Sequence, residues 1–86
     1  MNVDANKVCG RCVARLRKES GLTQVELAER LGMPQSYVSK VETGERSLRA
    51  YELFGYAKAL EMGVESLVSK LEHAIYENER ERPSKD

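Results

Sequence analysis

The 86-residue chain contains, from residue 23 to residue 44, the stretch Thr23-Gln-Val-Glu-Leu-Ala-Glu-Arg-Leu-Gly-Met-Pro-Gln-Ser-Tyr-Val-Ser-Lys-Val-Glu-Thr-Gly44. In its first half the Thr23 hydroxyl can accept a hydrogen bond from the Glu26 amide, while the Glu26 carboxylate accepts one from the Thr23 amide. This capping box begins a helix. The apolar residues that follow have helical spacing, and Gly32 can take the left-handed conformation that ends the helix.

A second short helix is predicted to follow closely. Pro34 fits its first turn, where the N–H that proline lacks would have no partner, and Gly44 ends it. Val38 and Val41 are its only strongly apolar positions, so core packing alone does not explain the segment. Because the rest of its surface is polar, we interpret this helix as a contact surface, not a merely solvated one.

Three further helices are predicted around this pair. The first begins near Asn6 or Lys7 and ends at Gly21. The fourth in chain order follows Ser47 and is apolar enough to form the centre of the core, and the fifth starts near Gly63. Their apolar positions are Cys9, Val13 and Leu16; Leu48, Tyr51, Leu53, Phe54, Ala57 and Leu60; and Val64, Leu67, Val68, Leu71, Ala74 and Ile75.

The composition agrees with an all-α domain. Hydrophobic residues make up 41% of the chain and charged residues 33%, with two prolines and no tryptophan, which favours helices. The formal net charge is zero, which excludes a histone-like protein that binds polyanions by bulk charge alone. The charge is nevertheless uneven: residues 7–49 hold nine Lys and Arg against five acidic residues, and residues 50–86 hold five against eight.

The organisation expected is one domain with two charged or polar ends. No apolar run is long enough to cross a bilayer, and the charged first residues do not resemble a signal peptide, so a cytoplasmic protein without a membrane partner is expected. Residues 1–6 are predicted to be flexible, residues 7–78 to form the domain, and residues 79–86 to form a flexible tail. Within the domain, the two-helix motif spans about 23–43 and the C-terminal helix about 64–78.

The stretch from Arg17 to Arg46 resembles the helix-turn-helix of the Cro and phage-repressor type, also called the XRE family. The resemblance extends from Cys9 to about Val68, and its most specific parts are Leu22-Thr-Gln24, Glu26-Leu-Ala28, Gly32 and Val41-Glu-x-Gly44-x-Arg46. It implies a five-helix, phage-repressor-like domain. The function implied is a sequence-specific transcriptional regulator of the repressor type that binds double-stranded DNA and is not an enzyme.

The resemblance also assigns roles to residues of the motif. Gln35 stands where the family reads bases, and a glutamine can pair with both N6 and N7 of adenine. Arg17 and Glu42 match a family ion pair, which we expect to be exposed and to orient the second helix of the motif more than to stabilise the domain. The base-contacting candidates are Gln35, Ser36, Ser39 and Lys40, and the candidates for the DNA backbone are Gln24, Thr23, Tyr37, Arg46 and Arg49.

Two loops depart from the family pattern. Leu48 stands where the family often has proline, so Ser47 is the expected cap of the fourth helix. Glu61 stands where a glycine usually ends that helix, so we expect Met62 to be buried and Gly63 to make the turn.

The pair Cys9 and Cys12 forms a CxxC motif that could be a redox pair or half of a zinc site. The chain has no second CxxC, and His73 is far away in sequence. A packing role is therefore favoured, with Cys9 as a buried apolar residue. We expect no metal and no cofactor, and His73 is expected to lie on the surface.

The fifth helix has near-heptad apolar spacing, which favours a homodimer. The dimerisation candidates are Leu67, Leu71 and Ile75. The alternative function is an antitoxin-like or complex-subunit interaction module that keeps the fold and uses its C-terminal helix to bind a protein partner.

Overall fold

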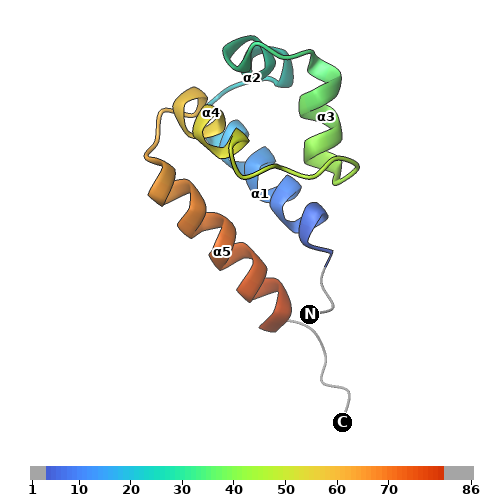
Figure 1. The fold of residues 1–86 in the computed structure, drawn as a ribbon, viewed down its shortest axis with the longest axis vertical. Helices are drawn as coiled ribbons and strands as arrows, with labels where there is room; N and C mark the ends of the chain where they lie inside the picture. The colour runs from blue at the N-terminus through green and yellow to red at the C-terminus, as the bar shows by residue number, and fades with distance from the viewer. Residues whose placement is uncertain (1–3, 81–86) are drawn as a thin grey trace.

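The computed structural model describes residues 4–80, and this part of the chain forms five α-helices and no strand (Figure 1). The helices are α1 (Ala5–Glu19), α2 (Gln24–Leu31), α3 (Gln35–Thr43), α4 (Glu52–Ala59) and α5 (Val64–Arg80). The all-α prediction with five helices is confirmed. Within residues 4–80, no helix is both long and apolar enough to span a membrane.

Helix α1 is the centre of the arrangement. It contacts α3 on one side and α5 on the other, and Figure 1 shows these two helices on opposite sides of α1. The helix begins at Ala5, earlier than expected, because the Asp4 carboxylate caps it by accepting from the Lys7 amide at 3.2 Å. Cys12 is the buried cysteine, whereas Cys9 is only half-buried.

The crossing of α1 and α3 depends on Gly10. A Cβ atom at this position would lie 2.7 Å from the carbonyl oxygen of Glu42 and closer still to that of Val41. The missing side chain lets the two backbones touch, which fixes the end of α3 against α1.

Helix α4 begins later than predicted. Leu48 stays in the preceding loop, and Ser47 does not cap the helix; instead the Glu52 carboxylate accepts from the Arg49 amide at 2.8 Å. With this start, Tyr51 and Phe54 point outward and are 65% and 64% exposed. The central residue of the core is Tyr56, which is fully buried. The expectation that Tyr51 and Phe54 form the core is therefore wrong.

The turn between α4 and α5 is made by Glu61, not by Gly63. Glu61 has φ +57°, the left-handed conformation that the family usually gives to glycine. Met62, which was predicted to be buried, packs against the core but is only half-buried. Helix α5 continues to Arg80, two residues past its expected end, while the rest of the predicted tail, residues 81–86, lies outside the described residues.

Helix α5 uses most of its apolar face inside the monomer. Leu67 is fully buried and Leu71 is 8% exposed, because α5 packs along α1 and α4. Leu67 and Leu71, which were predicted to form a dimer contact, therefore pack inside the monomer. Ile75 is half-buried, whereas Val68 and Tyr76 of this helix are exposed.

Candidate nucleic-acid interface

The motif formed by α2 and α3 begins at the predicted capping box. The Thr23 hydroxyl accepts from the Glu26 amide at 3.1 Å, and the Glu26 carboxylate accepts from the Thr23 amide at 2.9 Å. Gly32 ends α2 with φ +68°, and Pro34 is the residue that precedes α3, one position before the expected first turn. The two short helices are thus joined by a tight turn, as predicted.

Helix α3 has one buried side and one polar, outward side. Tyr37, Val38 and Val41 are buried against the core. The four predicted base-contacting residues lie on the other side, where Gln35, Ser36 and Lys40 are exposed and Ser39 is half-buried. The structure therefore brings these four side chains together on one surface.

Tyr37, which is predicted to lie along a DNA backbone, packs its ring inside the protein. Its ring is buried, lies 6.4 Å from the ring of Tyr56, and is covered by the Arg46 guanidinium at 4.7 Å. Burial raises the pKa of the Tyr37 hydroxyl, and the nearby Glu52 carboxylate raises it further. Its main role in this structure is to pack α3 against α4.

The Arg17–Glu42 pair is present, but it is buried and not exposed as expected. Arg17 Nε and Nη2 donate to the Glu42 carboxylate at 2.7 and 3.0 Å, and Nη1 donates to the Leu22 carbonyl at 2.8 Å. The two side chains are only 9% and 6% exposed. The hydrogen bond with Glu42 raises the pKa of Arg17. Because a buried ion pair is expensive to break, this pair fixes the end of α3 to α1 and to the start of α2.

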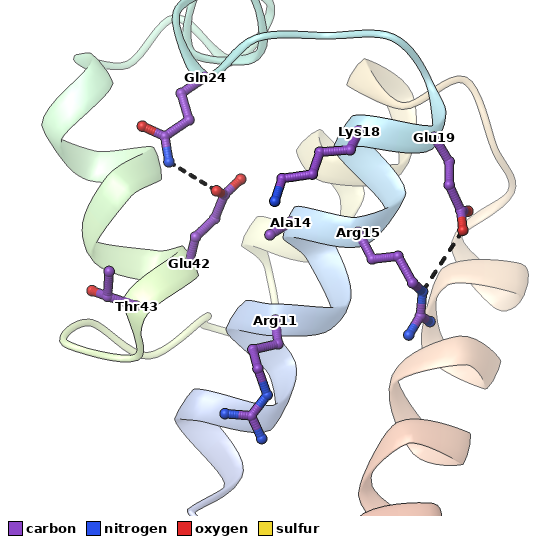
Figure 2. Close-up of a pocket in the computed structure, with 8 residues that line it drawn as sticks. All are labelled: Arg11, Ala14, Arg15, Lys18, Glu19, Gln24, Glu42 and Thr43. Atoms are coloured by element: carbon purple, nitrogen blue, oxygen red, sulfur yellow. Dashed lines mark hydrogen bonds and ion pairs between the residues drawn. The ribbon is translucent and has the colours of Figure 1, made fainter.

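Gln24 extends this pair to the outward face of α3. Its Nε2 donates to the Glu42 carboxylate at 2.9 Å (Figure 2). Its Oε1 accepts from Gln35 Nε2 at 3.2 Å. A continuous series of hydrogen bonds therefore leads from buried Arg17 to exposed Gln35. One N–H of the Gln24 amide is not used by these bonds, so this N–H and the first backbone amides of α2 remain available to a phosphate.

Arg46 and Arg49 follow α3 in the loop before α4. Arg46 Nη1 donates to the Glu52 carboxylate at 2.9 Å and to the Ser47 carbonyl at 3.0 Å, which leaves its Nε and Nη2 for other acceptors. Burial alone would raise the pKa of Glu52, but hydrogen bonds from Arg46 and from the Arg49 amide hold it below its usual value. The Arg49 side chain is exposed.

Two residues that position this surface were missed in the sequence. Glu52 orders the loop that carries Arg46 and Arg49, and only its contacts in three dimensions reveal this role. The sequence does contain a signal for Gly10, which is a glycine inside a predicted helix. A glycine there costs about 1 kcal/mol of stability relative to alanine, so its presence indicates a structural requirement.

Among the side chains of residues 4–78, the remaining titratable groups form no second site. Burial raises the pKa of both thiols, Cys9 and Cys12, which disfavours the reactive thiolate. His73 is exposed beside Glu77, as expected for a surface residue. Residues 4–80 contain no group of three His, Cys, Asp or Glu that could hold a metal ion.

Comparisons with known proteins agree with this geometry. Residues 13–73 match the family model described as helix-turn-helix. A protein of Sinorhizobium fredii (strain NBRC 101917 / NGR234), described as the uncharacterized HTH-type transcriptional regulator y4dJ, is 40% identical over 67 residues, which are 78% of this chain and 87% of that protein.

Solved structures share the fold. The XRE-family like protein from Pseudomonas syringae pv. tomato str. DC3000 is 38% identical, with a TM-score of 0.70 over 80% of this chain and 84% of that one. The restriction-modification controller protein C.Esp1396I was solved as a tetramer in complex with its natural 35 base-pair operator. It is 26% identical, with a TM-score of 0.75 over 88% of this chain and 99% of that one.

Proposed function

The chain belongs to the helix-turn-helix family of the Cro and phage-repressor type and is a DNA-binding transcriptional regulator, and we propose that it acts as a repressor-type homodimer on a palindromic double-stranded operator. In this proposal α3 enters the major groove, which is wide enough for a helix, and α2 lies across the phosphate backbone. The proposal assigns the chain no catalytic activity, and it includes a cytoplasmic location, where such an operator is found.

The observation that carries the proposal is the position of Gln35. It is the first residue of α3, it is exposed, and one N–H of its amide is held by Gln24 at 3.2 Å. The second N–H and the Oε1 remain, and these are the donor and acceptor that match N7 and N6 of adenine. Gln24 thus fixes the Gln35 amide before DNA arrives. Ser36, Ser39 and Lys40 would read or approach neighbouring bases from the same side.

The backbone contacts in this proposal come from both ends of the motif. The amides at the start of α2, beside Thr23 and Gln24, are suited to one phosphate because the helix N-terminus carries partial positive charge. The free nitrogens of Arg46 and the exposed Arg49 would reach phosphates on the other side of α3. These contacts position the protein and do not select a sequence.

The homodimer is proposed to form through an apolar hollow between α4 and α5. Leu53, Phe54, Val64 and Val68 line it, and Phe54 and Val68 are unusually exposed for apolar side chains. Since α3 and α5 are on opposite sides of α1 (Figure 1), a second copy on this face leaves both α3 helices free. Two-fold symmetric proteins of this kind bind half-sites about one helical turn apart.

The proposal is tested by selecting bound sequences from a pool of random duplexes at near-physiological salt. We expect an inverted repeat whose half-site centres are about 10 base pairs apart. If no sequence is enriched, the operator proposal is wrong, and the chain is better explained as an interaction module whose partner binds the hollow between α4 and α5.

A further inference from the structure

A groove beside α3 is lined in part by residues of α1, which the helix-turn-helix motif does not include. Helix α1 contributes one wall, and the start of α2 and the end of α3 contribute the other (Figure 2). The residues that line it are Arg11, Ala14, Arg15, Lys18 and Glu19 from α1, with Gln24, Glu42 and Thr43 opposite them.

The α1 wall carries positive charge at helical spacing. Arg11, Arg15 and Lys18 are four and three residues apart, so they share one side of the helix. Figure 2 shows Arg15 turned toward Glu19, whose carboxylate is 3.9 Å away. Among the side chains of residues 4–78, Arg11 and Lys18 form no ion pair.

The acidic residue on the opposite wall does not neutralise these cations. Both oxygens of Glu42 accept hydrogen bonds from Arg17, and one of them also accepts from Gln24. Its charge is therefore balanced within the buried pair. Arg11 and Lys18 remain as uncompensated charges at the edge of the surface that carries Gln24.

We propose that Arg11 and Lys18 bind phosphates of the DNA strand that passes the start of α2, so that the footprint extends from the motif onto α1. This inference rests on the proposed function. The groove makes the two surfaces continuous, because Gln24 and Thr43 belong both to its wall and to the edge of the motif. Seven residues of α-helix rise about 10 Å, so the two cations contact different phosphates.

This extension explains how a chain of zero net charge holds a polyanion. Its C-terminal part is acidic, so the attraction must come from a local basic surface. Arg46 is already paired with Glu52. Arg11 and Lys18 supply charge that pairs with no carboxylate among the side chains of residues 4–78.

The test is the salt dependence of binding to the selected operator for Arg11→Gln, Lys18→Gln and the double variant. The slope of log K against log salt is negative, and each phosphate contact adds about 0.9 to its magnitude. We expect the magnitude of the slope to fall by about 0.9 for each single variant and by about 1.8 for the double variant. The matched control is Lys58→Gln, which removes one charge from the exposed side of α4 and should leave the slope unchanged.

Two further measurements separate the possible outcomes. Arg11→Lys keeps the charge and should keep the wild-type slope. A single neutral methylphosphonate, moved along the operator, should weaken the wild type at positions where it no longer weakens the double variant. If the wild type binds operator and both glutamine variants behave like Lys58→Gln, this inference is overturned while the proposed function stands. If the wild type binds no DNA, both are overturned.

Discussion

Removal of the Glu42 carboxylate should destabilise the domain far more than loss of a surface ion pair. Glu42 holds Arg17 through bonds of 2.7 and 3.0 Å between nearly buried side chains. In Glu42→Ala the guanidinium keeps only the Leu22 carbonyl among its present acceptors. Breaking a buried pair by removing one partner costs about 3–5 kcal/mol, whereas an exposed pair contributes about 0–1 kcal/mol.

We expect Glu42→Ala to lower the free energy of unfolding by about 3 kcal/mol, the low end of that range, because Arg17 keeps one acceptor. For a domain of this size the corresponding fall in Tm is about 12–24 °C. Urea unfolding followed by circular dichroism measures the change. The control is Glu45→Ala, an exposed carboxylate in the next turn, which should change stability by less than about 0.5 kcal/mol.

A double variant, Arg17→Met with Glu42→Met, tests the cause of the loss. It removes both charges and leaves apolar side chains of similar length, so most of the stability should return. The reasoning is refuted if Glu42→Ala loses less than about 1 kcal/mol, the limit for an exposed pair, or if the double variant is less stable than Glu42→Ala.

Three other predictions follow from the packing, the loop and the apolar hollow. Gly10→Ala should destabilise the domain by about 1–3 kcal/mol, because its Cβ would meet the backbone of α3. The control is Gly55→Ala in α4, where the nearest neighbour of the added Cβ is 3.7 Å away, and this variant should stabilise the domain by about 0.5–1 kcal/mol. Equal effects of the two variants in thermal unfolding would contradict the close crossing of α1 and α3. Because the pKa of Glu52 is lowered in the folded state, its contribution to stability is complete above the unfolded pKa of about 4.3 and is lost as pH falls through the folded value. The difference in free energy of unfolding between wild type and Glu52→Gln should therefore shrink between pH 6 and pH 3, and a constant difference would argue against the ion pair. Val68→Lys should give a monomer in sedimentation equilibrium. The control Ser66→Lys, at an exposed position elsewhere on α5, should remain dimeric. A dimeric Val68→Lys variant would show that the dimer interface is not at this hollow.

The elements read correctly from sequence depend on short-range chemistry. The capping box at Thr23 and the left-handed glycines Gly32 and Gly44 involve atoms a few residues apart, so the sequence alone specifies them. The polar side of α3 was predictable for the same reason, since only Val38 and Val41 were strongly apolar. These local features were enough to indicate the two-helix motif and its outward face.

The wrong predictions concern features that depend on tertiary packing. Helix α4 starts at Glu52 because that carboxylate binds the loop before it, and this start turns Tyr56 inward and Phe54 outward. Leu71 is buried because α5 lies along α1. Heptad spacing in the sequence does not show whether an apolar face packs against the same chain or against a second copy. The burial of the Arg17–Glu42 pair likewise depends on how closely α1 approaches α3.

The most direct test of the account is to compare wild type and Gln35→Ala on the selected operator and on operators with each A·T pair of a half-site replaced in turn. The account predicts one A·T position where replacement weakens wild type by about 1–3 kcal/mol but has little effect on Gln35→Ala, while the other positions affect both proteins alike. If every replacement weakens the two proteins equally, Gln35 does not read a base, and the proposed role of α3 as the recognition helix with Gln35 at its tip is contradicted.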